Sequence, residues 1–348
     1  MRRILRYIVL AGLAVAVLVT VSPDDVLRLA AFAASQPGMT VLAFTAYATA
    51  FGLRALAWGL LLPGSGPRLP FATLWRLTLA ANLVNHLAPG KLGEVTRIIL
   101  AERQGLPRTV AVASVVHARL VDTAALLAVA APALAWSLVG RGRSPGSGAV
   151  AAAGGLEDPP PLPPGLPRGW PAAALVAAGL GLAALWALRA LGPRLARRWP
   201  VLDAFTRPVT AIPAHRLAAA FLAAAASWPL EAGILAVVSR GLGVFLDPVA
   251  VVAVTLVAVA GQVIAITPGG LGTYEANMTL ILQLYGVSPA TAFRAGLFTH
   301  LAKYLFAIAA GLEPAWRLAG GPGPQAASHQ AAEPFLAVAR QEVHHGDL

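Results

Sequence analysis

Long apolar runs, separated by short polar or proline- and glycine-rich stretches, dominate the pattern of this chain. A helix needs about 20 apolar residues to cross the roughly 30 Å hydrocarbon core of a bilayer. The runs are rich in alanine and leucine and lack the alternating short strands of a membrane barrel, so they predict helices. The predicted spans cover residues 5–21, 39–62, 109–139, 170–188, 217–238 and 289–312.

Two further apolar segments are broken by a Pro-Gly pair. The first segment, from residue 71 to residue 108, is interrupted at Pro89-Gly90, and the second break, at Pro268-Gly269, separates residues 248–267 from residues 270–285. Lipid cannot satisfy the backbone groups that such breaks release, so the breaks must face protein or a polar cavity. We expect two broken helical hairpins with a shared polar cavity.

The two breaks share the sequence Pro-Gly-x-Leu-Gly, and an acid follows each of them, Glu94 in the first and Glu275 in the second. Each broken segment then leads through a turn that ends in proline into a span with a histidine and a base. These pairs are His117 with Arg119 and His300 with Lys303. The shared order predicts an internal duplication, with units of about 38–139 and 214–312.

A single predicted span, residues 170–188, lies between the units, so the second unit starts on the opposite side of the membrane and the repeats are inverted. Arginines concentrate on one side of this arrangement, which sets the N-terminus in the cytoplasm of a bacterial inner membrane. Residues 1–319 then form one transmembrane domain. We expect residues 140–169 to be a flexible extracytoplasmic loop and residues 320–348 a disordered cytoplasmic tail.

Composition agrees with an all-α polytopic membrane protein. Hydrophobic residues make up 57% of the chain and charged residues 12%, and the mean hydropathy is +0.71. The net charge of +11 falls in short loops, which favours a role in membrane topology over a nucleic-acid partner. There are no cysteines, and the histidine pair near the end lacks a second ligand cluster, so we expect no metal and no cofactor.

Helix starts that follow the two breaks are suited to bind anions. Their first N–H groups lack intrahelical partners and carry partial positive charge, which favours phosphate. Lys91 adds a point charge at the first break. An anionic lipid headgroup would match these features.

The stretches "APGKLGEVTR", "ARLVD" and "TPGGLGTYEA" with the following "GVSPATA" resemble the transmembrane flippase domain of the lysylphosphatidylglycerol synthase family, as a stand-alone member without the aminoacyl-transferase domain. The resemblance covers roughly residues 1–315 and implies movement of a lipid or lipid-linked headgroup between leaflets. It departs at Ala118, where many members of the family have an acid. The substrate-binding candidates are Pro89, Gly90, Lys91, Gly93, Glu94, Arg97, Arg119, Asp122, Pro268, Gly269, Gly272 and Glu275.

Each candidate also has a purely structural interpretation. In this interpretation Arg119 and Asp122, three residues apart on a helix, only neutralise each other. Glu94 and Glu275 then serve to cap the half-helices that follow the breaks. Lys91 snorkels to the interface in that reading. His117, His300 and Lys303 are candidates for proton coupling, with packing as the alternative. For Asn82, Asn85 and His86 we favour hydrogen bonds to the broken backbone, and for Glu231 a place beside the kink at Pro229.

The leading hypothesis is a flippase for an anionic phospholipid or a polyprenyl-phosphate-linked headgroup. The alternatives are a component of a membrane-embedded lipid glycosyl- or aminoacyl-transferase and a small-solute transporter of similar architecture. Because neither an Asp-x-Asp pair nor a P-loop is present, the sequence predicts that the chain is not an enzyme. A separately encoded lipid-modifying transferase is a further candidate partner, and the oligomeric state stays open.

Overall fold

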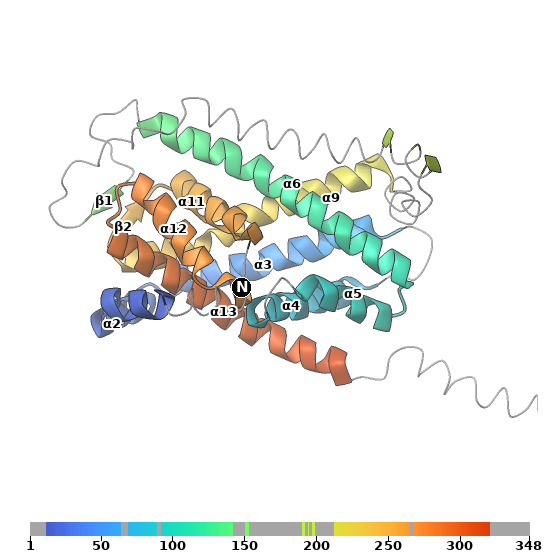
Figure 1. Cartoon of the computed structure of the whole chain (residues 1–348), viewed down its shortest axis with the longest axis horizontal. Coiled ribbons are helices and arrows are strands. Elements are labelled where there is room, and N and C mark those ends of the chain that lie inside the picture. The colour runs from blue at the N-terminus through green and yellow to red at the C-terminus, as the bar shows by residue number, and fades with distance from the viewer. Residues whose placement is uncertain are drawn as a thin grey trace, which may run out of the picture.

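The computed structural model describes residues 12–63, 69–88, 92–141, 150–152, 212–264 and 267–320, with the isolated residues 190, 191, 194, 197 and 198. Within these limits the protein is a bundle of helices (Figure 1). The predicted span 170–188, the tail beyond residue 320 and the three residues 89–91 of the first break lie outside the described residues.

The N-terminal half of the described chain contains six helical segments. Residues 12–20 are helical and lead into α2 (Pro23–Ser35), after which come α3 (Pro37–Leu61) and α4 (Phe71–Leu87). The short α5 (Gly93–Arg103) follows the first break, and α6 (Arg108–Arg141) is the longest helix. The predicted spans 39–62 and 109–139 therefore match helices to within about two residues, whereas α2 was not predicted.

The C-terminal half begins with α9 (Ala214–Glu231) and α10 (Gly233–Gly241), which divide the predicted span 217–238 at a kink next to Pro229. Next come α11 (Pro248–Ala260), the 3₁₀ turns η3 (Gly261–Ile264) and η4 (Pro268–Gly270), α12 (Thr273–Leu284) and α13 (Pro289–Gly320). The second break is thus a pair of 3₁₀ turns, and α13 continues eight residues beyond the predicted span.

Local sequence explains where several helices begin. Proline opens α2, α3, α11 and α13, because its fixed φ suits the first turn and its missing N–H would be unpaired there in any residue. The side chain of Asp247 accepts hydrogen bonds from the N–H groups of Val249 and Ala250, both at 2.9 Å, and caps α11. Such a cap contributes about 1 kcal/mol to the stability of a helix.

A short two-stranded β-sheet is also present among the described residues. Strand β1 (Val150–Ala152) pairs in antiparallel fashion with β2 (Val244–Leu246), so that Ala151 faces Phe245. Part of the predicted loop 140–169 is therefore tied to the connection between α10 and α11.

Four stretches are long and apolar enough to cross a membrane: Pro37–Leu61, Arg108–Trp136, Ala214–Gly241 and Pro289–Leu318. No more than half of each apolar window is buried inside the protein, so the rest faces outward. Leu42, Leu222 and Leu305, for example, are each more than half exposed. Apolar surface on this scale is a feature of a membrane protein, and the chain is a multi-pass α-helical one.

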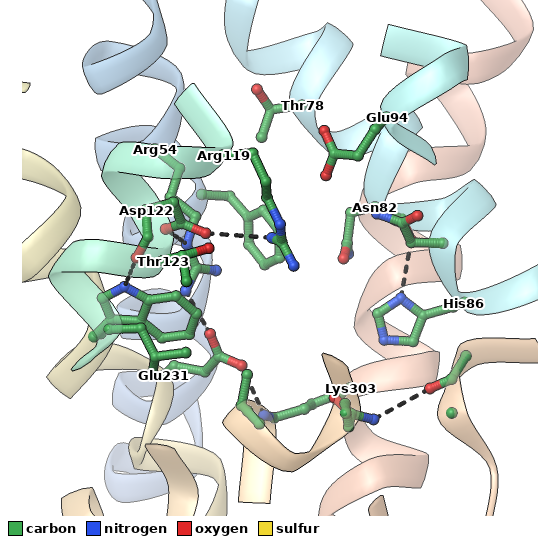
Figure 2. A pocket seen from close by; sticks show the side chains of 18 of the residues that line it. Arg54, Thr78, Asn82, His86, Glu94, Arg119, Asp122, Thr123, Glu231 and Lys303 are labelled. Atoms are coloured by element: carbon green, nitrogen blue, oxygen red, sulfur yellow. Dashed lines mark hydrogen bonds and ion pairs between the residues drawn. The ribbon is translucent and has the colours of Figure 1, made fainter. Parts of the chain in front are cut away.

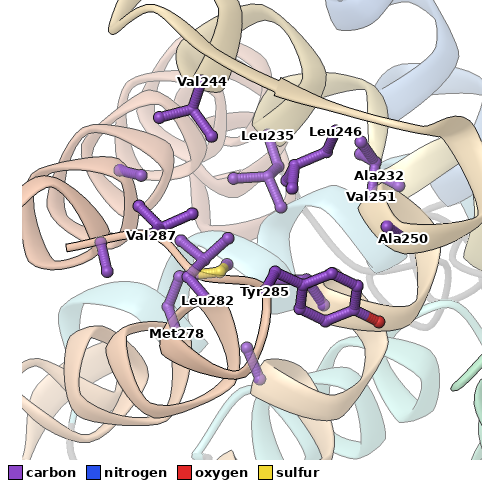
Figure 3. Packing of buried hydrophobic residues seen from close by; sticks show 14 of the residues in the cluster. Ala232, Leu235, Val244, Leu246, Ala250, Val251, Met278, Leu282, Tyr285 and Val287 are labelled. Atoms are coloured by element: carbon purple, nitrogen blue, oxygen red, sulfur yellow. The ribbon is translucent and has the colours of Figure 1, made fainter. Parts of the chain in front are cut away.

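The main apolar core lies where α10, α11, α12 and the start of α13 meet. Leu235, Met278 and Leu282 are fully buried there, and Val287 joins them from the turn before α13 (Figure 3). This packing fixes the second broken segment against α13. The first broken segment packs against α13 as well, through α4. The long helix α13 therefore holds both breaks in place.

Candidate functional site

A cavity of about 210 Å³ lies in the middle of the bundle, where the two breaks approach each other. Its walls include side chains from α3, α4, α5, α6, α9, α12 and α13 and the backbone of η4. Figure 2 shows Arg54, Asp122 and Glu231 along one side of this cavity and Asn82, His86 and Glu94 along the other. Far-apart parts of the sequence therefore contribute to one polar site.

A chain of alternating charges runs along one wall of the cavity. Arg54 on α3 donates a hydrogen bond to Glu231 at 2.7 Å, and its Nε lies 3.5 Å from Oδ1 of Asp122. The other oxygen of Glu231 accepts a hydrogen bond from Lys303 at 2.8 Å. Arg119 continues the chain with an ion pair to Asp122 at 3.4 Å. Because an isolated charge inside a membrane protein is costly, each of these groups depends on its neighbours.

Aromatic rings hold the cations in place. The guanidinium of Arg54 lies 4.2 Å from the ring centre of Trp228, and the indole N–H of Trp228 donates a hydrogen bond to the backbone oxygen of Asp122 at 3.1 Å. The ammonium group of Lys303 lies 5.1 Å from the ring of Tyr274. Such cation–π contacts contribute about 0.5–2 kcal/mol each to stability and hold the charged group in a fixed position.

Basic side chains outnumber acidic side chains among the described residues that line the cavity. Among the described residues around the cavity, four side chains are basic (Arg54, Arg97, Arg119 and Lys303) and three are acidic (Glu94, Asp122 and Glu231). Arg119 is the most accessible of these cations, with 45% of its side chain exposed against 14% for Arg54. The site therefore suits a ligand with a negative charge, which Arg119 is placed to meet first.

Several buried polar atoms of this lining have no hydrogen-bond partner within the described part of the chain. They are Arg54 Nε, Asn82 Nδ2, Glu94 Oε2, Arg97 Nε and Asp122 Oδ1. A buried polar atom without a hydrogen bond costs about 1–3 kcal/mol, so native proteins rarely keep several in one place unless water or a ligand completes them. Both donors and acceptors are present, although Arg54 Nε and Asp122 Oδ1 face each other in their ion pair at 3.5 Å.

Two of the three polar residues before the first break, Asn85 and His86, hydrogen bond to the backbone as predicted. Asn85 accepts a hydrogen bond from the backbone N–H of Gly93 at 2.8 Å, and Nδ1 of His86 lies 2.9 Å from the carbonyl oxygen of Asn82. Gly93 is required here, because a Cβ atom would overlap the carbonyl oxygen of Ala81. The structural role expected for these residues is therefore seen for Asn85 and His86, whereas Nδ2 of Asn82 has no hydrogen bond within the described residues.

The second break is closed by Glu275, whose carboxylate accepts a hydrogen bond from the backbone N–H of Gly272 at 2.7 Å. The same carboxylate lies 2.8 Å from Nδ1 of His300. Glu275 is only 1% exposed and does not line the cavity among the described residues, so its visible role is to cap α12. At this break, Tyr304 donates a hydrogen bond to the carbonyl oxygen of Pro268 at 3.1 Å.

Seven of the residues proposed from the sequence line the cavity: Glu94, Arg97, Arg119, Asp122, Gly269, His300 and Lys303. Gly93, Pro268, Gly272 and Glu275 lie in the two breaks beside it, and His117 is buried on α6 away from it. The other three, Pro89, Gly90 and Lys91, lie outside the described residues.

The sequence pattern did not single out Arg54, and it favoured a structural place beside Pro229 for Glu231. Arg54 is an arginine inside the apolar run 39–62, and an ionisable residue in such a run is itself a signal of function. Ala118 also lines the cavity, next to Arg119. The family acid that is replaced by Ala118 would have made basic and acidic groups equal in number.

Comparison with curated proteins finds a relative named "Glycosyltransferase AglD" from Haloferax volcanii, 26% identical over 354 residues. The match includes 88% of this chain and 54% of the relative, so the chain spans about half the length of that protein. The prediction that the chain is not an enzyme is wrong by this comparison. It relied on the absence of an Asp-x-Asp pair and a P-loop from this chain.

The sequence pattern of the family described as "Lysylphosphatidylglycerol synthase TM region" matches residues 3–311. This range includes both breaks, the charged wall of the cavity, three of the four described helices long enough to span a membrane and most of the fourth, Pro289–Leu318. The chain therefore belongs to the lysylphosphatidylglycerol synthase transmembrane-region family.

Proposed function

We propose that the central cavity binds the phosphate-bearing headgroup of a membrane lipid and that the protein moves this lipid between the two leaflets. The observation that supports this proposal best is the cavity between two helix breaks, which combines an excess of basic side chains with buried polar atoms that lack hydrogen bonds within the described residues. Lipid hydrocarbon satisfies neither feature, and a phosphate group with hydroxyls satisfies both.

Arg54 and Lys303 are both committed to Glu231, so they set the potential of the cavity without being free to reorient. Arg119 has one longer ion pair and a half-exposed side chain. We infer that Arg119 makes the first contact with the phosphate, while Arg97 and Asn82 contact the headgroup from the opposite wall. Inverted repeats around a site near the membrane midplane would let the headgroup be reached from either side.

The test is leaflet exchange of fluorescent phosphatidylglycerol in vesicles that contain the purified protein. Exchange should exceed that of protein-free vesicles and fall about tenfold or more in Arg119→Gln, as expected for one lost charge-assisted hydrogen bond. Arg108→Gln is the matched control, because this arginine lies at the start of the same helix with 85% of its side chain exposed. Exchange equal to protein-free vesicles, or unchanged in Arg119→Gln, would refute the proposal.

A second candidate is transfer of a glycosyl group on a membrane lipid, which is favoured by the name of the relative from Haloferax volcanii. Carboxylates that line the cavity, Asp122 and Glu94, each have one oxygen without a hydrogen bond within the described residues, as acid–base groups would need. Lipid mass spectrometry after incubation with lipid-linked sugar donors distinguishes the two candidates. A new glycolipid that depends on Asp122 would favour transfer over translocation alone.

We also propose a bacterial inner-membrane location with the N-terminus in the cytoplasm, on the basis of the arginine-rich segments. A separately encoded lipid-modifying transferase is a natural partner, since it would supply the headgroup that the cavity receives.

A further inference from the structure

A cluster of titratable side chains joins the two breaks at one end of the cavity. Nδ1 of His300 lies 2.8 Å from the carboxylate of Glu275, and the side chains are 3% and 1% exposed. Since the other oxygen of this carboxylate already accepts the N–H of Gly272, the pair links the cavity directly to the start of α12.

Rings from the same two helices, α12 and α13, and from α4 surround this pair. The ring centre of Tyr304 lies 5.0 Å from that of His300 and 4.9 Å from that of His86. Tyr274 on α12 lies 4.5 Å from His300. His86 and His300 both line the cavity, whereas Glu275 lies behind them. A proton from the cavity therefore meets His300 before it meets Glu275.

The charged and titratable groups around His300 determine where it can bind a proton. Glu275 and Tyr274 face it from α12, Lys303 and Tyr304 from its own helix, and His86 from α4. The positive charge of Lys303 is already matched by Glu231 at 2.8 Å. An ionised Glu275 requires a hydrogen on Nδ1 of His300, which leaves the lone pair of Nε2 as the acceptor. A proton taken from solvent forms one N–H bond there and creates an imidazolium paired with a carboxylate.

We propose that His300 takes up a proton when the cavity binds an anionic phosphodiester headgroup, so that lipid binding and proton binding are linked. This inference depends on the proposed function, which supplies the headgroup. A negative charge in the cavity favours the charged form of a nearby histidine. Linkage is reciprocal, so protonation of His300 must strengthen headgroup binding by the same factor.

Calorimetry of the detergent-solubilised protein with dioctanoyl phosphatidylglycerol measures the linkage, because the phosphodiester itself does not change charge between pH 5 and 8. Titrations in two buffers with different ionisation enthalpies count the protons taken up. The wild type should take up a fraction of one proton at pH 7, and its Kd should fall about five- to tenfold from pH 8 to pH 5.5. Glycerophosphoglycerol, the same headgroup without acyl chains, shows whether the free headgroup is enough.

His300→Gln should bind with no buffer dependence and no pH dependence of Kd. His215→Gln removes an exposed histidine at the start of α9 and should behave as wild type. Lipid binding by the wild type without proton uptake, or proton uptake that persists in His300→Gln, overturns the inference but leaves the proposed function intact. The absence of any phosphatidylglycerol binding overturns both. The wild-type titration tests the inference even if His300→Gln does not fold.

Discussion

The carboxylate of Glu231 accepts a hydrogen bond from the guanidinium of Arg54 at 2.7 Å, although the two residues are 177 positions apart in the sequence. Arg54 belongs to α3 and Glu231 ends α9 at the kink that follows Pro229. Each side chain is at most 14% exposed. The pair therefore ties the two halves of the chain together at the wall of the cavity.

Removal of both members of this pair should destabilise the protein by less than the sum of the two single losses. Arg54→Met leaves Glu231 with Lys303 alone, and Glu231→Gln leaves Arg54 with only its longer contact to Asp122, so each unbalances the buried charges. We expect each to lower the free energy of unfolding by roughly 3 kcal/mol. The double variant keeps the net charge of the cluster, so its loss should be smaller than the sum of the two. Tryptophan fluorescence during denaturant unfolding in detergent measures this, and strictly additive losses would contradict the ion-pair interpretation.

The second break should tolerate no side chain at Gly269. This residue has a φ of +59°, and a Cβ atom would overlap the hydroxyl group of Tyr304 and lie 2.8 Å from the carbonyl oxygen of His86. Gly105 has a φ of +92° with nothing within 4 Å of the same position, so Gly105→Ala carries only the backbone strain. We expect Gly269→Ala to lose about 1–3 kcal/mol more than Gly105→Ala in the same unfolding assay. Equal losses would show that the break is not closely packed.

Much of the helical framework was predictable, because apolar runs and proline positions are local signals. The predicted spans 109–139 and 289–312 both lie within long helices, the first hairpin divides into α4 and α5, and the second break occurs at Pro268-Gly269. The division between α9 and α10 is harder to place from sequence, because the helix continues past Pro229 to Glu231 and resumes at Gly233. The pairing of β1 with β2 depends on segments almost a hundred residues apart, which no local pattern reveals.

The site was predictable only in part. Arg119, Asp122 and Lys303 stand out as ionisable residues inside apolar spans, and all three line the cavity. Their partners are long-range: Arg54 meets Asp122 and Glu231 only because α3 packs between α6 and α9. Sequence spacing showed the pair Arg119–Asp122 on one helix but not the network that surrounds it. The inverted relation of the two units stays a prediction.

Acid should weaken the attachment of α2 to α13. Asp25, in the first turn of α2 and outside the four candidate spans, is buried and accepts a hydrogen bond from Arg294 at 2.7 Å. Burial alone would raise the pKa of Asp25, but hydrogen bonds from Ser22 and the charge of Arg294 outweigh it and hold the pKa below its ordinary value of 3.8. The unfolded chain therefore binds this proton more readily than the folded protein does.

The sign of the pH effect follows from this lowered pKa. The contribution of Asp25 to stability is present at pH values above about 4 and is lost as the pH falls through the folded pKa. Unfolding measured from pH 7 to pH 3 should therefore show a deficit for Asp25→Asn at pH 7 that shrinks toward pH 3. Asp24→Asn changes an exposed neighbour in the same turn and should show little deficit at any pH. A deficit for Asp25→Asn that stays constant with pH would exclude the ionised carboxylate as its cause.

The predicted inversion of the two units can be tested by cysteine labelling. The sequence has no cysteine, so any introduced thiol is the single one in the chain. Thr109 lies just after the first broken segment and Ala290 just after the second, and both are exposed at the start of a long helix. In Figure 1 these two helices, α6 and α13, extend from opposite ends of the bundle. If the units are inverted and the N-terminus is cytoplasmic, Ala290→Cys faces the outside and Thr109→Cys faces the cytoplasm.

A membrane-impermeant maleimide added to intact cells should label Ala290→Cys at once and Thr109→Cys only after the membrane is permeabilised. The wild type, which has no thiol, gives the background. Labelling of both positions from the same side would mean that the two broken segments enter the membrane from one face. The headgroup would then have a single route to the cavity, and alternating access between leaflets would require a different movement.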